Sequence, residues 1–407
     1  MSTGMSPAPQ PRVPGMERLP RLAHPGGVDA DGHVLEPPDL WDRYLEPSLR
    51  ARALRVRADE QGLEYLEIDG RPSKLVRGGM PAGLGAMDRV GGMVYERDKK
   101  TGLLYVDNAP LGAMDPGERL LRLDLENLER AFLYPTLGVL WVAECEDEEL
   151  TQAYVRAYNR WIVEFCADSG GRLVPIAQLS LGDPAAAEAE LRRAVRDGAR
   201  GVWSPPFTHT RLPLGHPDHH RVFAAAEELG VPFAIHPSFE PKWAGPGRFG
   251  EYTSMKLGFF INVTAPDAVR HAFTSLFQYG VFDLFPALRV VVLESGAGWI
   301  GYWLDRMDAV YRSPQGMFVR QVLKREPSAC FREQCWIAGD PDETTLSAVI
   351  PRVGEDRFFW ASDFPHPDHP PEYIPEVTRI VAELPASARA GFLGANVLRA
   401  YRLERPA

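Results

Sequence analysis

Residues 173–204 read LVPIAQLSLGDPAAAEAELRRAVRDGARGVWS, and this stretch indicates the fold class. The apolar run at 173–181 predicts a strand. Asp183, which is followed by a proline, is typical of a helix start, and Gly198 would end that helix. The residues at 201–204 predict a second, short strand. A strand, a helix and a strand in succession indicate two parallel strands joined by a helix.

The same alternation recurs on both sides of this unit. Each predicted element is an apolar run, or an apolar stripe at three-to-four spacing, between turn residues. Strands are predicted at 27–35, 132–142, 173–181, 201–204, 232–236, 288–294 and 357–363, and helices at 147–168, 184–197, 218–229, 266–279, 299–311 and 371–384. A count that approaches eight strand–helix units favours an α/β fold of the closed (β/α)8 TIM-barrel type over an open doubly wound sheet.

Two segments stand apart from this alternation. Residues 1–25 are rich in proline and arginine and lack an apolar run, so we expect a disordered tail there and not a signal peptide. Residues 39–130 show no sustained period, and we expect an insertion after the first strand, either a surface loop or a lid over a site. Apart from that insertion, 26–407 is expected to be a single barrel domain.

Composition argues against several functional classes. The chain has 407 residues and a formal net charge of -10, and this acidic balance argues against nucleic-acid binding. The four cysteines show no CxxC spacing, which argues against thiolate metal sites and fits a reducing compartment. No apolar run reaches the ~18 residues of a membrane span. We therefore expect a cytoplasmic protein that binds a small-molecule substrate, without nucleic acid or membrane as a partner.

Residues that can bind a metal follow the predicted strands, at the end where the active sites of such barrels lie. The first strand ends in Asp31-Gly32-His33, and residues two apart in a strand point the same way, so Asp31 and His33 can aim together into the barrel mouth. His236 ends the strand at 232–236, which would be the fifth; it could instead be a satisfied core histidine. Carboxylate oxygens and imidazole nitrogens together suit Zn, Mn or Fe.

Two further carboxylates end predicted strands. Glu294 ends the strand at 288–294, which would be the seventh, and Asp363 ends the last one. Glu294 could instead pair with Arg306, and Asp363 could cap the following turn. The convergence of several such residues on strand ends favours a metal site over these alternatives.

Three motifs resemble the amidohydrolase-related family, which includes aminocarboxymuconate semialdehyde decarboxylase and aromatic acid decarboxylases of the resorcylate type. The motifs are DADGHV at 29–34, AIHP at 234–237 and ASDFPH at 361–366. The resemblance covers most of the chain from 28 to 403 and is weak up to residue 130. It implies a metal-dependent barrel enzyme, and a homodimer as its assembly. The metal ligands that it implies are Asp31, His33, His236 and Asp363.

Two residues depart from the family pattern. Members often carry His where Asp31 stands, and some decarboxylases carry Glu; a carboxylate makes the site harder and favours Mn or Fe over Zn. Members usually present an acid–base histidine where this chain has Glu294. Glu294 could act as a base once burial raises its pKa, or it could bind a second metal ion.

The leading prediction is a metal-dependent decarboxylase or hydrolase that acts on a small organic acid or secondary metabolite. One divalent metal (Zn, Mn or Fe) would activate water or substrate at the barrel mouth. Asp363 would bind the metal and orient that water, Glu294 would move a proton, and the following His366 and His369 could support the ligands.

Two alternatives remain open. A non-haem di-iron or mixed-metal oxygenase on the same fold would use two ions, with Glu294 binding the second one. A catalytically inactive binding protein would retain the barrel without the chemistry.

Overall fold

The computed structural model describes residues 19–87, 104–244, 258–367, 369 and 372–403. Within them, eight strands form one sheet in the order β1-β5-β6-β7-β8-β9-β10-β11, and each neighbouring pair is parallel. The strands are β1 Gly27–Val34, β5 Leu128–Pro135, β6 Leu173–Gln178, β7 Gly201–Ser204, β8 Phe233–Ile235, β9 Val290–Val292, β10 Cys335–Gly339 and β11 Phe358–Trp360.

The sheet closes on itself where β1 meets the segment after β11. The backbone N–H of Asp363 donates to Asp31 O (2.9 Å), and the N–H of His33 donates to Phe364 O (2.6 Å). The strands are buried on both faces, as parallel strands covered by helices must be. The structure thus confirms the predicted (β/α)8 barrel.

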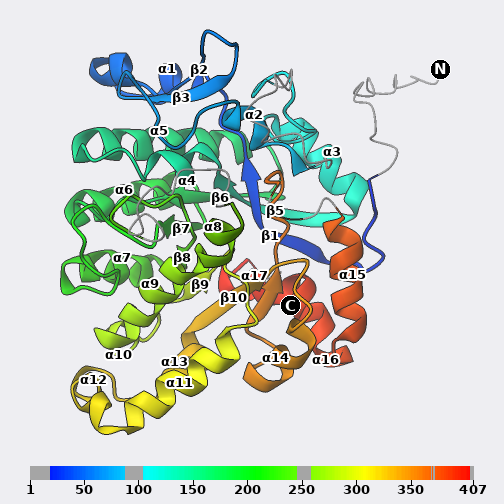
Figure 1. Ribbon diagram of the computed structural model, residues 1–407. Helices are drawn as coiled ribbons and strands as arrows, with labels where there is room; N and C mark the ends of the chain where they lie inside the picture. The colour runs from blue at the N-terminus through cyan, green and yellow to red at the C-terminus, as the bar shows by residue number, and fades with distance from the viewer. Residues whose placement is uncertain (1–18, 88–103, 245–257, 368, 370–371, 404–407) are drawn as a thin grey trace.

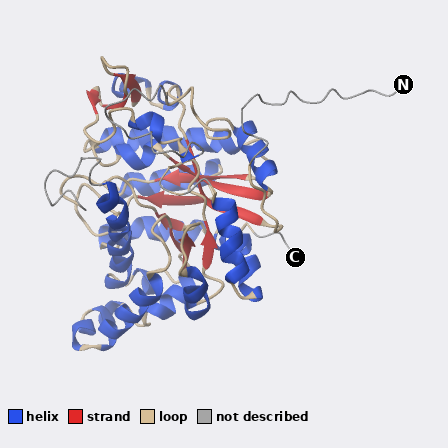
Figure 2. Ribbon diagram, turned by 45° about the vertical axis from the view of Figure 1, so that its right-hand side comes forward, coloured by secondary structure: helices blue, strands red, loops and turns tan. Residues whose placement is uncertain are grey.

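Helices follow the strands and surround the barrel (Figures 1 and 2). The longer ones are α3 Pro116–Glu126, α5 Glu148–Cys166, α6 Pro184–Asp197, α7 His220–Leu229, α9 Pro266–Gln278, α11 Ile300–Arg312, α13 Pro327–Gln334, α14 Leu346–Val353 and α15 Tyr373–Glu383. The shorter ones are α1 Leu40–Tyr44, α2 Met80–Gly83, α4 Leu137–Trp141, α8 Gly258–Thr264, α10 Val281–Leu284, α12 Val319–Val322, α16 Ala386–Ala390 and α17 Asn396–Ala400. Pro47–Arg52, Pro217–His219 and Pro314–Met317 form 3-10 turns, and Gly391–Ala395 is a π-type turn. No helix in the described ranges combines the length and apolarity that crossing a membrane requires.

Helix α6 shows why residues close to a helix end predict that end correctly. The Asp183 side chain accepts hydrogen bonds from Ala185 N (2.9 Å) and Ala186 N (3.1 Å), which satisfies two N–H groups of the first turn. Gly198 ends the helix with φ 131°, a backbone conformation that side chains disfavour. Both residues act within a few positions of the helix end, so the sequence alone predicts both boundaries.

Two strand predictions are wrong in part. The strand predicted at 132–142 ends at Pro135, and α4 follows, because the Glu36 carboxylate accepts hydrogen bonds from the N–H groups of Leu137 and Gly138. A continuous apolar run cannot distinguish a strand from a buried helix. The prediction also missed β10, which lies between β9 and β11. Separately, it numbered the strand that precedes Glu294 as the seventh, whereas β9 is the sixth strand of the barrel.

The region at 39–130, predicted as irregular, contains regular structure. A three-stranded antiparallel sheet, β2 Arg55–Ala58, β3 Glu64–Ile68 and β4 Arg71–Pro72, lies at the top of Figure 1. Its strands have four, five and two residues, too few for a periodic signal. The helix α3 then leads into β5 as a regular part of the barrel.

Two contacts connect this region to the carboxyl ends of the strands. The N–H of Met87 donates to Pro365 O (3.2 Å), and the hydroxyl of Tyr105 donates to Glu36 O (3.1 Å). Residues 1–18 of the predicted tail lie outside the described residues. Leu22 is buried, and its N–H donates to Glu126 O (2.9 Å).

Candidate metal centre

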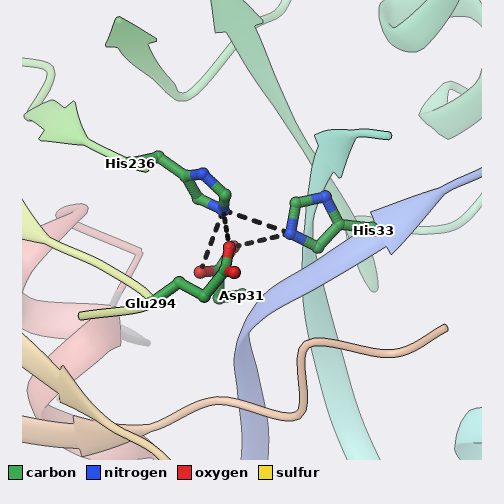
Figure 3. Close-up of side chains that lie close together, drawn as sticks. All are labelled: Asp31, His33, His236 and Glu294. Carbon is green, nitrogen blue, oxygen red and sulfur yellow. Dashed lines mark hydrogen bonds and ion pairs between the residues drawn. The ribbon is translucent and has the colours of Figure 1, made fainter. Parts of the chain in front are cut away.

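Side chains from four strand ends meet inside the barrel mouth. Asp31 and His33 lie on β1, His236 follows β8, Glu294 follows β9 and Asp363 follows β11. Figure 3 shows the two imidazole rings facing each other, with the carboxylates of Asp31 and Glu294 beside them. All five predicted site residues therefore come together, although they are spread over more than 300 positions of the 407-residue chain.

The distances between these groups are short. The Nε2 atoms of His33 and His236 are 3.2 Å apart. Asp31 lies beside both, with Oδ1 3.6 Å from His33 Nε2 and Oδ2 3.5 Å from His236 Nε2. Glu294 Oε2 is 3.0 Å from His236 Nε2, and Asp363 Oδ1 is 3.3 Å from His33 Nε2. One ligand atom from each of Asp31, His33, His236 and Glu294 lies within 4.8 Å of the others.

Hydrogen bonds on the far side of each ring set the histidine tautomers. His33 Nδ1 lies 2.8 Å from Pro135 O, and His236 Nδ1 lies 2.6 Å from Pro237 O. A carbonyl oxygen can only accept, so each Nδ1 carries the proton and, in a neutral ring, each Nε2 presents a lone pair. Burial lowers the pKa of His33 well below its usual value, which keeps that ring neutral. Two acceptor nitrogens thus face each other, an arrangement that a cation would stabilise.

A cation would also stabilise the Asp31 carboxylate. It is fully buried, and neither oxygen accepts a hydrogen bond from any residue that the structure describes. Burial raises the pKa of this carboxyl well above its usual range, and the nearby charge of Asp363 raises it further. Buried polar groups are nearly always hydrogen-bonded or bound to a metal, so these oxygens indicate a missing positive partner.

The glycine of the Asp31-Gly32-His33 motif leaves room for a fourth carboxylate, that of Asp29. Asp29 accepts hydrogen bonds from Ser362 N (2.9 Å) and Ser362 Oγ (2.7 Å), which join β1 to the segment after β11. A Cβ at position 32 would lie 2.6 Å from Asp29 Oδ2, closer than carbon and oxygen pack. The sequence did not single out Asp29, because its role depends on a residue more than 300 positions away.

Two of the carboxylates occupy unusual backbone conformations. Glu294 has φ 39° and Asp363 has φ 54°, both in the left-handed region that residues with a side chain rarely adopt. Such conformations cost about 1–3 kcal/mol each and cluster at functional sites. Their occurrence at the ends of two barrel strands supports a functional role for both side chains.

His366 forms a hydrogen bond with the Asp363 carboxylate and orients it. Its Nδ1 lies 2.8 Å from Asp363 Oδ1, and because a carboxylate accepts, Nδ1 donates. His366 Nε2 then accepts from the hydroxyl of Thr136 at 2.9 Å. His369 lies farther away, with Nε2 3.9 Å from Asp363 Oδ2. A second set of side chains could also hold a metal ion and overlaps the set around Asp31. It consists of His33, Glu294, Asp363 and His366.

Two acidic residues near the site were missed. Glu36 is buried after β1 and accepts hydrogen bonds from the N–H groups that begin α4; burial raises its pKa to about 7. Asp340 follows β10, and burial raises its pKa to about 7 as well. The signal for Asp340 was its position after an apolar stretch, Cys335–Gly339, which was not recognised as a strand.

Comparison with known proteins agrees with this architecture. The family model described as amidohydrolase matches residues 104–403. A gamma-resorcylate decarboxylase of Rhizobium radiobacter is 27% identical over 301 residues, which cover 70% of this chain and 86% of that protein.

Solved structures of low sequence identity share the fold. An amidohydrolase from Mycobacterium avium subsp. paratuberculosis K-10 is 21% identical, with a TM-score of 0.74 over 93% of this chain and 99% of that chain. A dihydroxybenzoic acid decarboxylase from Polaromonas sp. JS666, with bound manganese and the inhibitor 2-nitroresorcinol, is 17% identical, with a TM-score of 0.63 over 94% and 98%. Since the family match spans most of the sequence and the barrel agrees with it, this chain belongs to the amidohydrolase family.

Proposed function

We propose that the protein is a metal-dependent decarboxylase that acts on a small aromatic acid. The observation that carries this proposal is the buried cluster of Asp31, His33 and His236: both Asp31 oxygens accept no hydrogen bond from the described residues, and the two imidazole Nε2 atoms lie 3.2 Å apart. The similarity to a gamma-resorcylate decarboxylase supports decarboxylation over hydrolysis. The Polaromonas decarboxylase that shares the fold has manganese bound, which supports a divalent metal.

The ligands of one divalent ion would be Asp31, His33, His236 and Asp363. This set mixes carboxylate oxygen and imidazole nitrogen, which suits Mn, Zn or Fe. A nearby cation favours the carboxylate anion and the neutral imidazole, and so offsets the costs of burying Asp31 and His33. When bound, such an ion supplies positive charge that polarises and orients the substrate.

Glu294 is the best-placed residue to transfer a proton. Decarboxylation breaks the bond between the ring carbon and the carboxylate; the electron pair stays on the ring carbon, which takes a proton as CO2 leaves. The Glu294 side chain is 19% exposed, against 1% for His236, so it lies at the boundary between the cluster and solvent. We propose that a protonated Glu294 donates to the ring carbon and regains its proton from water.

Asp363 has a different role in this scheme. The hydrogen bond from His366 Nδ1 holds Asp363 Oδ1 as an acceptor. A carboxylate that accepts such a bond is stabilised as the anion. We therefore assign Asp363 to binding the metal and orienting the molecule beside it, and not to donating the proton.

The test separates metal binding from chemistry. Protein purified without chelator would be analysed for metals by elemental mass spectrometry and screened for CO2 release from aromatic acids. We expect about one metal ion per chain. Asp31→Asn should lose the metal, whereas Glu294→Gln should keep it and lose CO2 release. Glu383→Gln, on the exposed face of α15, is the matched control and should change neither. A fully active Glu294→Gln protein would exclude the proposed proton transfer.

One observation favours a second candidate, an oxygenase with two metal ions. The two overlapping sets of ligand-type residues share His33 and Glu294, and Glu294 would then help to hold the second ion. Two metal ions per chain, with oxygen consumption during turnover, would support this candidate. Full turnover under nitrogen would exclude it. A protein that binds metal and aromatic acids but never turns over would instead support the inactive binding protein.

Compartment and assembly are part of the same proposal. The acidic net charge and four free, buried cysteines support a cytoplasmic location and a small-molecule partner. The family resemblance supports a homodimer, which light scattering of the metal-loaded protein would test.

A further inference from the structure

Two buried polar atoms on neighbouring barrel strands lack a hydrogen-bond partner. Trp203 on β7 is 0% exposed, and Gln178 on β6 is 1% exposed. Neither Trp203 Nε1 nor Gln178 Oε1 forms a hydrogen bond with any residue in the described ranges. Buried side-chain polar atoms normally have a partner, so each of these atoms calls for one.

Both side chains lie on the inner face of the barrel, next to the candidate metal centre. Gln178 pairs with Trp203 in the register of β6 and β7, and laterally paired residues of parallel strands point to the same face. Trp203 in turn pairs with Ala234, two residues before His236, so all these side chains share one face. The ring of Trp203 contacts the ring of His236 edge-on, with centroids 5.5 Å apart.

The Gln178 amide has a defined orientation. Its Nε2 donates to Gly138 O at 3.1 Å, which leaves Oε1 as the free acceptor. A Cβ at position 138 would lie 2.7 Å from Oε1, so a side chain at that position would crowd the acceptor. The amide oxygen is therefore held without a donor and kept clear by a glycine.

The two atoms are complementary to a hydroxyl group. An indole N–H can only donate, and an amide oxygen can only accept. A hydroxyl accepts one hydrogen bond and donates one, so a single O–H placed between these side chains would satisfy both. A carboxylate would serve only the indole, and an ammonium group would serve only the amide.

We propose that Trp203 and Gln178 select substrates that carry a ring hydroxyl. The indole N–H donates to the hydroxyl oxygen, and the hydroxyl proton is donated to Gln178 Oε1. This inference rests on the proposed function, because the ring must enter the barrel with its carboxylate at the metal centre. A site with two such buried groups discriminates strongly against analogues that lack the hydroxyl, since both groups would remain unpaired.

The competing explanation is a structural water held by the same two atoms. Buried waters form two to four hydrogen bonds to otherwise unsatisfied groups, and these side chains offer two. A structural water would contribute to stability and leave ligand selectivity unchanged. Binding selectivity therefore distinguishes the two explanations.

The chain contains a matched control for each residue. Trp141 on α4 also has a buried Nε1 without a partner among the described residues, but it packs against Tyr154 of α5. Gln152 on α5 likewise has an unpartnered buried Oε1, and its Nε2 donates to Ser180 O. Trp203→Phe and Gln178→Met would be compared with Trp141→Phe and Gln152→Met.

The experiment measures binding by calorimetry to the manganese-loaded protein. The probes are benzoate, the three monohydroxybenzoates and their methoxy counterparts. We expect one hydroxybenzoate to bind the wild-type protein about tenfold more tightly than benzoate, the factor typical of one net hydrogen bond. Its methoxy counterpart should lose most of that advantage, because it cannot donate to Gln178. The preference should fall to within about twofold in Trp203→Phe and Gln178→Met, and persist in both controls.

Several outcomes would overturn the inference. It is wrong if the wild-type protein does not distinguish hydroxybenzoates from benzoate, and this comparison needs no variant to fold. It is also wrong if the preference persists in Trp203→Phe, or if that variant only melts at a lower temperature than Trp141→Phe, as a structural water predicts. CO2 release measured in parallel separates the two proposals. Hydroxyl-dependent binding without CO2 release refutes the function alone, and CO2 release without hydroxyl preference refutes this inference alone.

Discussion

Arg172 at the amino-terminal end of the barrel and Asp31 at the carboxyl end differ in whether their polar atoms have hydrogen-bond partners. At the amino-terminal end, Arg172 donates to Asp124 Oδ1 (2.7 Å) and to Glu129 O (3.1 Å), while Arg21 donates to Asp124 O (2.9 Å). At the carboxyl end, the two oxygens of Asp31 are buried and accept no hydrogen bond from the described residues. The first set is exposed in part and satisfied, whereas the second is buried and unsatisfied.

This difference separates stability from function. Polar groups that form hydrogen bonds with one another contribute to folding and leave no donor or acceptor that a ligand could bind. Groups that are buried without partners destabilise the isolated protein, and they persist where a metal or substrate completes them. In barrels of this type the active site lies at the carboxyl end and the opposite end serves stability. Substitutions at the two ends should therefore change different measured quantities.

The largest effect is expected at Asp31. Asp31→Asn should weaken metal binding by about 100-fold or more, beyond the effect of changing a group that only supports a ligand. The same substitution should leave the melting temperature of the metal-free protein unchanged or raise it, because a neutral amide replaces a carboxyl whose ionised form is costly to bury. Manganese titration and thermal unfolding, each with and without metal, would measure both. A large loss of stability in the metal-free variant would contradict the comparison.

The next effect concerns pH and Glu36, a carboxyl-end group that is hydrogen-bonded. Burial raises its pKa from 4.5 to about 7. The folded protein therefore holds a proton that the unfolded chain releases, so this group lowers stability as pH rises from about 4.5 to about 7. The loss should reach roughly 3 kcal/mol above that window. Glu36→Gln, which stays neutral, should remove it.

Urea unfolding of the wild-type protein and of Glu36→Gln at pH 5 and pH 8, both with saturating manganese, would measure this difference. The variant should gain stability relative to the wild type at pH 8 and not at pH 5. An equal difference between the two proteins at both pH values would show that Glu36 does not titrate in this range.

A smaller effect is expected at Gly32, between the two ligands of β1. Gly32→Ala would place a methyl group 2.6 Å from Asp29 Oδ2. Overpacking of this kind should destabilise the protein by about 2 kcal/mol and weaken metal binding as well. Gly301→Ala is the control: its added carbon would meet nothing closer than 3.7 Å, and in helix α11 alanine should stabilise by about 0.5–1 kcal/mol. Opposite signs in chemical unfolding would confirm the difference between the sites.

The smallest effect is expected at the amino-terminal end. Arg172→Ala removes hydrogen bonds to Asp124 and to the Glu129 carbonyl, in a side chain that is 33% exposed. Because water screens such a partly exposed pair, the loss of stability should be only about 1 kcal/mol. Metal content and CO2 release should not change. A changed metal affinity in this variant would show that the two ends of the barrel are coupled.

The regular part of the fold could be predicted because its signals are local. The helix α6 begins at Asp183 and ends at Gly198 through interactions that span a few residues. The motif residues Asp31, His33, His236 and Asp363 could be named because each lies near the end of a recognisable strand or shortly after it. Their assignment as metal ligands stays a prediction. By contrast, β10 and the small sheet β2–β4 carried no clear period, and an apolar run concealed the start of α4.

The sequence by itself determined the alternation of strands and helices, and with it the placement of carboxylates and imidazoles at one end of a barrel. Only the tertiary structure decided that His33 and His236 present lone pairs to each other, that Asp29 joins β1 to Ser362, and that Trp203 lies unsatisfied beside Gln178. The physical reason is the sequence distance over which each kind of interaction acts. Periodicity and capping act between residues close in sequence, whereas the state of a buried polar atom depends on every group that closure of the barrel brings around it.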